Sequence, residues 1–367
     1  MLSKRIKRIE ESGIRKIFEL AAGKQGEFYD FSIGQPHFKT PDKLKKALAQ
    51  AAEDNYNRYT PTAGLPELKE KIASKLKNKN NIETEADNII VTSGVSGGIF
   101  LSFSSLLESG DEVILPDPYF VLYKQMLDFL GVKTVFWDTY PDFHLNGKKL
   151  EKLITSKTKA IILNSPNNPT GMVYSREELK KVAEIAQKRG LYIFSDEVYE
   201  QFDYEGKFFS IGSIYDKTIT LNGFAKSHLI TGWRVGYVSA PKEIIEAMNK
   251  LQQYTFVCAS SVAQQALNLA WEVDLSDYVD EYRKNRDFVI SNLNSAYEFC
   301  NTEGSYYFFL KNPREKKDFV SELIEHKVLV VPGRVFSQKK GYFRFSLAVD
   351  LKTLKKGIEI LNKVAKK

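Results

Sequence analysis

Between residues 87 and 240, seven short apolar runs alternate with stretches that have the periodicity of helices. The runs are NIIV, EVIL, KTVFW, KAIIL, LYIF, KTITL and RVGYV. Apolar strands joined by helices are typical of an open, mostly parallel sheet that helices cover on both faces. We therefore expect an α/β fold with a seven-stranded, mostly parallel sheet. In such sheets ligands bind at the carboxyl ends of the strands.

The two ends of the chain follow another pattern. Residues 1–30 predict an arm and a short helix, residues 274–295 one long helix, and the later runs YYFFL, KVLVV and YFRFSLA predict strands. Because 367 residues exceed a typical single domain, we expect two domains. The large domain comprises residues 42–280, and a smaller α+β domain comprises residues 1–41, with the N-terminal arm, and 281–367.

Two helix starts are predicted from local signals. Thr40 followed by Pro41 predicts an N-cap and a first helical residue. Ser175 and Glu178 match a capping box before the helix REELKKVAEIAQKRG.

The composition indicates a cytoplasmic protein. The net charge is +7, but lysines alternate with glutamates, as in PELKEKIASKLK, and no basic block typical of nucleic-acid binding is present. The N-terminus has no signal-peptide core, and no apolar run is long enough to span a membrane. Cys258 and Cys300 lack CxxC spacing, and the four histidines lack ligand-like neighbours. We expect no metal, no nucleic acid and no membrane among the partners.

The polar residues that follow these runs carry the chemistry. After KTITL, Lys226 precedes Arg234 by eight residues, so two strands joined by a loop would hold both side chains at one edge of the sheet. A partly dry lysine has a lowered pKa and is a nucleophilic amine. An arginine grips a phosphate through two parallel hydrogen bonds. An amine beside a phosphate clamp is what binding of pyridoxal phosphate (PLP) requires.

Other strand ends add compatible groups. After LYIF come Asp196, a carboxylate that needs a cationic partner such as a protonated pyridine, and Tyr199. After NIIV, the sequence TSGVSGG at a helix start is a candidate anion site. After KAIIL, Asn168 lies in the rigid turn NSPNNPTG. Each feature has a structural alternative: a surface lysine, a glycine-rich turn, a tight connection or an N-cap aspartate. Their occurrence together at one edge favours a cofactor site.

These motifs resemble those of class I/II aminotransferases of the PLP fold type I superfamily over nearly the whole chain. The matching segments, in the family's order and spacing, are SIGQP, RYTPTAGLPELK, VTSGVSGG, PDPYF, NSPNNPTG, SDEVY, the stretch from Lys226 to Arg234, and FRFSLA. The resemblance implies a PLP-dependent aminotransferase that moves an amino group between an L-amino acid and a 2-oxo acid by a ping-pong mechanism.

The resemblance also implies a role for individual residues. Lys226 forms the Schiff base with PLP and shuttles the proton, Asp196 keeps the pyridine nitrogen protonated, and Asn168 and Tyr199 bind the ring oxygen. Arg344 binds the substrate α-carboxylate, and Gly34, which lines the same pocket, and Asn168 are also implied to bind the substrate. At the phosphate, contacts are implied for Arg234 and for the backbone of Gly94, Val95 and Ser96. Phe120 is implied to stack on the cofactor ring. Tyr59 is implied to reach the phosphate bound by the neighbouring subunit, and this role implies a homodimer.

Three positions depart from the family pattern. Gly223 and Ala225 replace serines found in many relatives, and Val95 stands where a glycine or small residue is common. Hydroxyl contacts to the phosphate are therefore missing beside Lys226, and Arg234, Ser96 or a water would have to compensate.

The substrate and two other functions stay open. Residues 251–270 contain no arginine for a distal carboxylate, which favours neutral or aromatic substrates, although aspartate stays open. Candidate lining residues are Tyr254, Phe256, Ser260, Ser261, Tyr306 and Tyr307. A PLP-dependent carbon–sulfur β-lyase on the same scaffold is the alternative function. A transcriptional regulator with a PLP domain is remote, because the 31 residues before SIGQP are too few for a winged helix domain.

Overall fold

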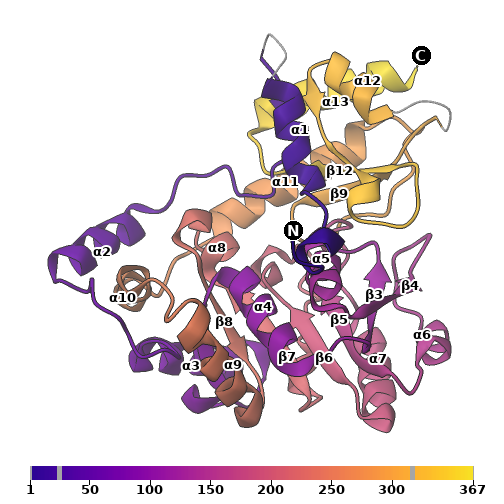
Figure 1. The fold of residues 1–367 in the computed structure, drawn as a ribbon. Coiled ribbons are helices and arrows are strands. Elements are labelled where there is room, and N and C mark those ends of the chain that lie inside the picture. The colour runs from indigo at the N-terminus through magenta and orange to yellow at the C-terminus, as the bar shows by residue number, and fades with distance from the viewer. Residues whose placement is uncertain (1, 23–26, 315–318, 367) are drawn as a thin grey trace.

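A seven-stranded sheet forms the centre of the molecule (Figure 1). The structure, a computed structural model, describes residues 2–22, 27–314 and 319–366. The strand order is β2-β8-β7-β6-β5-β3-β4, and β8 alone among these strands runs antiparallel to its neighbours. The strands are β2 (Ile89–Ser93), β3 (Glu112–Asp117), β4 (Lys133–Asp138), β5 (Thr158–Asn164), β6 (Tyr192–Asp196), β7 (Thr218–Gly223) and β8 (Val235–Ser239). All seven predicted strands and the mostly parallel arrangement are confirmed.

Helices cover both faces of this sheet, because successive strand residues point to opposite sides. Ile162 and Phe194 pack in one apolar cluster, with α4 (Gly94–Leu106), α5 (Val121–Leu130) and α9 (Lys242–Thr255). Ile161 and Ile193 pack in another, with α6 (Gly147–Leu153) and α7 (Arg176–Arg189). A third cluster joins the β2 and β8 edge to α2 (Asp42–Glu53), α3 (Pro66–Asn80) and α10 (Ser261–Leu269).

The two ends of the chain meet in a smaller region above the sheet (Figure 1). One short sheet pairs β1 (Tyr29–Asp30) with β10 (Val328–Leu329), and another has the order β11-β12-β9. Its strands are β9 (Tyr307–Lys311), β11 (Val331–Pro332) and β12 (Tyr342–Ser346). The helices of this region are α1 (Gly13–Ala22), α11 (Ser276–Asn292), α12 (Phe319–Glu325) and α13 (Leu351–Ala365). Helix α11 spans residue 280, where the predicted large domain ends. The domain limits therefore stay a prediction.

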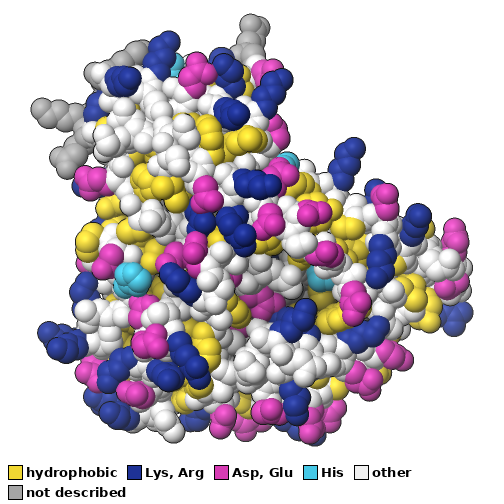
Figure 2. Space-filling view, turned by 180° about the vertical axis from the view of Figure 1, so that it is seen from behind, with side chains coloured by type: hydrophobic (Ala, Val, Ile, Leu, Met, Phe, Trp, Pro, Cys, Tyr) yellow, Lys and Arg dark blue, Asp and Glu magenta, His cyan; other side chains and the backbone are white. Residues whose placement is uncertain are grey.

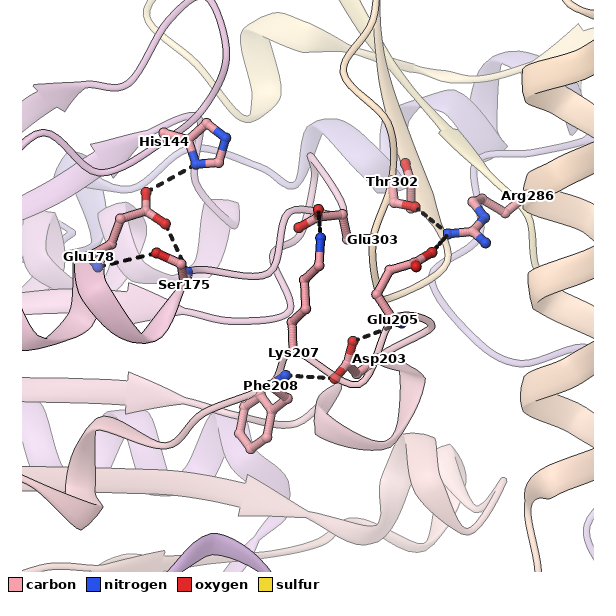
Figure 3. A network of polar contacts seen from close by, with 10 residues as sticks. All are labelled: His144, Ser175, Glu178, Asp203, Glu205, Lys207, Phe208, Arg286, Thr302 and Glu303. Carbon is pink, nitrogen blue, oxygen red and sulfur yellow. Dashed lines mark hydrogen bonds and ion pairs between the residues drawn. The ribbon is translucent and has the colours of Figure 1, made fainter.

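An ionic network joins the loop after β6 to this smaller region (Figure 3). Arg286 of α11 donates to a carboxylate oxygen of Glu205 over 2.6 Å and to the carbonyl of Thr302 over 3.2 Å. Lys207 and Glu303 form a second ion pair at 2.7 Å. The segment that leads into β9 is therefore fixed against the loop that follows the central strand β6.

One of the two predicted helix starts is wrong. The structure begins α2 at Asp42 with Pro41 as its N-cap, and the Thr40 hydroxyl instead donates to the carbonyl of Leu229 over 2.8 Å. The capping box of α7 is confirmed, since the side chains of Ser175 and Glu178 each bond to the other's backbone N–H.

The surface in Figure 2 mixes basic and acidic side chains over the visible face rather than gathering lysines in one block. None of the helices in the described ranges is long and apolar enough to cross a membrane.

Candidate active site

A cavity of about 250 Å³ opens at the carboxyl ends of the sheet strands. Strands β5, β6 and β7 end there, at Asn164, Asp196 and Gly223, and β8 begins there after Arg234. The structure brings ten of the predicted site residues together in its wall: Gly34, Val95, Ser96, Phe120, Asn168, Asp196, Tyr199, Lys226, Arg234 and Arg344. These come from the sheet, from the N-terminal segment and from β12, so distant parts of the sequence share one cavity.

Lys226 lies on the single-turn helix α8 (Phe224–Ser227), which directly follows β7. Its ammonium group donates a hydrogen bond to the carbonyl of Gly34. Burial, and then the positive charges of Arg344 and Arg234, lower the pKa of Lys226 to about 8, although Asp196 opposes the shift. At pH 7 about a tenth of this amine is therefore uncharged and nucleophilic, far more than of an ordinary lysine.

Asp196 ends β6 and is buried beneath the cavity. It accepts hydrogen bonds from the Tyr123 hydroxyl at 2.6 Å and from the Val198 N–H at 3.2 Å. Burial raises its pKa to about 6, against the effects of these hydrogen bonds and of Lys226. A cation placed over this carboxylate would remove much of that desolvation cost. The sequence did not identify Tyr123, because Phe120 is the extended N-cap residue of α5 and no local pattern marks Tyr123 as a cavity residue.

Arg344 is fully buried and holds no carboxylate partner among the described residues. Its Nη1 donates to the side-chain oxygen of Asn168 over 3.0 Å, and its Nη2 donates to the carbonyl of Ser32 over 2.7 Å. Its Nε has no hydrogen-bond partner in the ranges that the structure describes. Burial lowers the pKa of this guanidinium. A buried cation with an unused N–H beside a cavity suits an anionic ligand.

Asn168 is itself held by a residue that the sequence did not single out. Its backbone N–H donates over 2.8 Å to the side chain of Asn164, the last residue of β5. The Asn164 amide in turn donates to the carbonyl of Asp196 over 3.0 Å. The ends of β5 and β6 are thus joined, and the turn NSPNNPTG is anchored to the carboxylate strand.

The opposite end of the cavity forms a cradle at the start of α4. Gly94 has φ +68°, and a Cβ there would lie 2.6 Å from Nη2 of Arg234. Glycine is therefore favoured by the backbone conformation, and a Cβ would also displace the flexible end of the Arg234 side chain. Val95 and Ser96 line the cavity at this N-terminus, where free N–H groups favour an anion. Arg234 itself is exposed and donates to the carbonyl of Thr231 over 3.0 Å.

Tyr59 does not line the cavity of its own chain. Its exposed fraction is 83%, one of the highest among the large apolar side chains. The role implied for it requires a second subunit, which stays a prediction.

The side-chain pocket was only partly predicted. Of the six candidate residues, Tyr307 lines the cavity, whereas Tyr254 is 84% exposed and Ser260 caps α10. The apolar part of the wall includes Ile14, Ile99 and Leu122. These three come from three separate helices, and no local signal distinguishes them from ordinary packing residues.

The residues present fit pyridoxal phosphate. The cofactor needs a primary amine, an anionic partner for a protonated ring nitrogen and a cationic or N–H-rich cradle for its phosphate. Lys226, Asp196 and the cradle of Gly94 and Arg234 supply these groups, and they line or border one cavity. The protein groups therefore fit the aldehyde, the ring nitrogen and the phosphate of the cofactor.

Comparison with known proteins gives consistent matches. Residues 27–361 match the family described as aminotransferase class I and II. A probable aspartate aminotransferase of Methanocaldococcus jannaschii is 37% identical over 99% of this chain and 100% of that protein. The aromatic-amino-acid aminotransferase 2 of Thermococcus litoralis is 36% identical over 100% of this chain and 98% of that protein. The structure of Thermus thermophilus aspartate aminotransferase with maleate superimposes with a TM-score of 0.95, at 33% identity over 99% of both chains.

Fold, cavity and relatives together define an enzyme that uses pyridoxal phosphate. The chain belongs to the class I and II aminotransferase family, and it is a PLP-dependent aminotransferase. Its substrates are accordingly amino acids and 2-oxo acids. The relatives reported above are all named aminotransferases, so they lend no support to the lyase alternative.

Proposed function

We propose that this aminotransferase acts on amino acids with neutral side chains, aromatic ones included, and on the matching 2-oxo acids. The observation that carries the proposal is the charge of the cavity wall. Among the described lining residues the cations are Lys226, Arg234 and Arg344. Each of these has a role at the amine, the phosphate or the α-carboxylate, so none remains for a distal carboxylate.

The apolar lining supports the same conclusion. Ile14, Ile99 and Leu122 line the cavity with Phe120. Burying an apolar substrate side chain against them is favourable by about 25 cal/mol per Å². A distal carboxylate there would lose its hydration without gaining a partner.

The residues of the cavity divide the chemistry. Bound pyridoxal phosphate supplies an aldehyde that condenses with amines and a ring that accepts an electron pair. Lys226 Nζ is the amine that would hold the cofactor, and as a free amine it would take the proton from the substrate α-carbon. The negative charge of Asp196 would favour a protonated ring nitrogen. Asn168 and the Tyr199 hydroxyl would donate to the ring oxygen.

Arg344 is proposed to bind the substrate α-carboxylate. It sits fully buried in the cavity wall with an unused Nε–H. Asn168 and the carbonyl of Ser32 orient the guanidinium through its two terminal nitrogens. A carboxylate in this position would be fixed bidentately, which aligns the α-carbon with Lys226.

Half-reactions of the holoenzyme test the substrate class. Each standard amino acid is mixed with the enzyme without an acceptor, and the loss of the cofactor's absorbance is followed. Phenylalanine, tyrosine and leucine are expected to react at least 10-fold faster than aspartate and glutamate at equal concentration. A faster reaction with aspartate would contradict the proposed substrate class while leaving the aminotransferase assignment intact.

We also propose a homodimer in the cytoplasm. Tyr59 and Tyr254 are the most exposed large apolar side chains of the described chain, at 83% and 84%. Their segments adjoin, because Gln252 donates to the carbonyl of Thr62 over 2.6 Å. Phe256 and Val257, each 40% exposed, extend the same region. Such an aromatic region beside the cavity suits a second copy of the chain.

A further inference from the structure

Tyr307 contacts two functional side chains of the cavity at once. It is fully buried, lines the cavity and begins β9. Its hydroxyl lies 3.1 Å from the hydroxyl of Tyr199. Its ring lies 4.4 Å from the central carbon of the Arg344 guanidinium. None of the roles assigned so far explains why one tyrosine makes both contacts.

We propose that Tyr307 is a positioning residue, whose hydroxyl sets the donor direction of Tyr199 and whose ring fixes the plane of Arg344. The proposal rests on the roles proposed above for Tyr199 and Arg344. It adds that the side chains serving the cofactor oxygen and the substrate carboxylate share one support.

The hydroxyl contact has a directional consequence. Of the two hydroxyls, one donates and the other accepts. Tyr199 has a single proton, so it can donate into the cavity only when Tyr307 is the donor between the two. Tyr307 is the hydrogen-bond partner that the structure gives to the buried Tyr199 hydroxyl. No other hydrogen-bond donor to the Tyr199 hydroxyl is found in the described part of the chain, so removing the Tyr307 hydroxyl would leave Tyr199 without this orienting contact.

The ring contact acts on a cation that has lost its hydration. Arg344 lies between the rings of Tyr307 and Phe336, with its central carbon 4.4 and 4.6 Å from the two centroids. The faces of aromatic rings attract a desolvated guanidinium and restrict its plane. Because β9 and β12 pair with Tyr307 opposite Ser346 and Phe309 opposite Arg344, Tyr307 and Arg344 are diagonal neighbours on one face of the sheet.

Tyr307 is held rigidly enough to act as a support. Its carbonyl accepts a hydrogen bond from the Thr302 hydroxyl over 2.8 Å. On the cavity side, a Cβ on Gly34 would lie 2.8 Å from the Tyr307 hydroxyl, so the backbone at residue 34 closes over it. Arg286 fixes the segment before β9 through the carbonyl of Thr302 (Figure 3). The tyrosine is thus held at its backbone through Thr302 and confined at its hydroxyl by the backbone of Gly34.

Two variants separate the hydroxyl from the ring. Tyr307→Phe keeps the ring and removes the hydroxyl, and Tyr307→Leu removes both. Tyr342→Phe is the matched control, since Tyr342 lies on the adjacent strand β12 and outside the cavity wall. Two properties of the holoenzyme are measured: the pH midpoint of the cofactor's absorbance change, and the dissociation constant of 3-phenylpropanoate, a carboxylate without an amine. Cofactor content and thermal midpoint confirm that each variant is folded.

In Tyr307→Phe, we expect the absorbance midpoint to rise by about 0.3 to 1 pH unit, because a poorly oriented Tyr199 donates less well to the ring oxygen. Binding of 3-phenylpropanoate should stay within about twofold. Tyr307→Leu should in addition weaken that binding about 3- to 30-fold. Tyr342→Phe should change neither property.

Each part of the proposal has its own contradicting result. If the midpoint of Tyr307→Phe moves no more than that of Tyr342→Phe, the hydroxyl does not position Tyr199. If Tyr307→Leu binds the carboxylate as tightly as Tyr307→Phe does, the ring does not position Arg344. Tyr199→Phe separates this proposal from the role on which it rests. If the absorbance midpoint of Tyr199→Phe is unchanged, the proposed role of Tyr199 is wrong, and the proposal for Tyr307 is wrong with it. If the midpoint shifts in Tyr199→Phe but not in Tyr307→Phe, only the proposed role of Tyr307 is wrong.

Discussion

The backbone at Gly223 lies so close to neighbouring segments that no side chain fits there. A Cβ would lie 2.9 Å from Cα of Gly236 and 3.1 Å from Cγ2 of Val95. Two of the three departures from the family pattern, glycine at 223 and valine at 95, are therefore neighbours, and both the Gly236 backbone and the valine methyl occupy space that a serine at 223 would enter. With Ala225 also lacking a hydroxyl, we expect binding of the phosphate to depend on Arg234, Ser96 and backbone N–H groups.

Replacing Arg234 tests that dependence. Arg234→Ala is expected to weaken PLP binding about 10- to 100-fold, because a charged hydrogen bond to the phosphate contributes about 1.5–3 kcal/mol. The measurement is the dissociation constant of PLP from the reconstituted apoenzyme. Arg189→Ala is the control, since this exposed arginine ends α7 just before β6 begins, at the opposite edge of the sheet. Equal PLP affinity in the two variants would show that the phosphate is bound elsewhere.

The lowered pKa of Lys226 predicts a pH dependence for the apoenzyme. Burial and the two arginines bring this pKa to about 8. The rate of PLP binding should therefore rise with pH up to about 8 and then level off, whereas an ordinary lysine with a pKa of about 10.4 would show no plateau there. Stopped-flow absorbance from pH 6.5 to 9.5 measures it. A rate that still climbs tenfold per unit at pH 9.5 would contradict the cavity's effect on the amine.

The same shift has a defined sign for stability. Since the folded-state pKa of about 8 lies below the ordinary lysine pKa of 10.5, the unfolded chain binds more protons between those two pH values. The contribution of Lys226 to the free energy of unfolding of the apoenzyme thus increases as pH rises through that window. Below a pH of about 8, the free-energy cost of burying the charged amine lowers the stability in full. In Lys226→Ala this part of the pH dependence should disappear.

Among the elements, α3 is tied to the segment after β6 by a buried ion pair. Lys75 of α3 binds Glu200, and their side chains are only 12% and 10% exposed. Asn80 donates to the other carboxylate oxygen over 2.7 Å, and Tyr237 of β8 lies 3.3 Å from the Lys75 ammonium. Burial alone would lower the pKa of Lys75, but Tyr237 and Glu200 raise it overall.

Removing the carboxylate would leave this lysine buried without its partner. Glu200→Gln is expected to lower the free energy of unfolding by about 3–5 kcal/mol. Chemical denaturation of the holoenzyme measures the change. Glu359→Gln is the matched control, because Glu359 pairs with Lys356 at 2.9 Å on the exposed face of α13 and should leave stability unchanged. Similar stability losses in both variants would contradict a special contribution of the buried pair.

The elements also show what sequence patterns predict well. The seven strands were predicted because short, largely apolar runs alternate with helical stretches, a pattern typical of a parallel sheet covered on both faces. The predicted N-cap at Thr40 is wrong because the Thr40 hydroxyl donates a hydrogen bond to the carbonyl of Leu229, a residue far along the chain. Side chains at strand ends, such as Asp196 and Lys226, were identifiable since topology places strand ends together. Ile14 and Tyr123 were not, because only the folded chain carries their helices to the cavity.

For the molecule as a whole, the cavity draws on both ends of the chain and on the sheet between them. Gly34, Lys226 and Arg344 are far apart in sequence, and one carbonyl, that of Gly34, accepts the hydrogen bond of the lysine. The ion pair of Arg286 and Glu205 joins the smaller region to the loop after β6 (Figure 3). Because Lys226 follows β7 and Arg344 lies on β12, relative movement of the two regions would change the distance between these two side chains.

Tyr59 lies outside the cavity of its own chain, and in the proposed homodimer it would reach the site of the other subunit. We predict that the separate variants Tyr59→Ala and Lys226→Ala regain activity when their subunits are exchanged. In a mixed dimer, the site with an intact Lys226 would receive the intact Tyr59 of the other subunit. The second site would lack both groups. Statistical exchange of equal amounts makes half of the dimers mixed, so about a quarter of all sites would be complete.

The measurement is transamination before and after the two variants are mixed, unfolded together and refolded with PLP. Each variant refolded alone provides the baseline, and wild type refolded in the same way corrects for recovery. If Tyr59 served its own chain, the mixed dimer would hold no complete site, because the subunit with Lys226 would still lack its tyrosine. Activity that stays at the average of the two baselines would therefore contradict a site shared between subunits, whereas activity well above that average requires one.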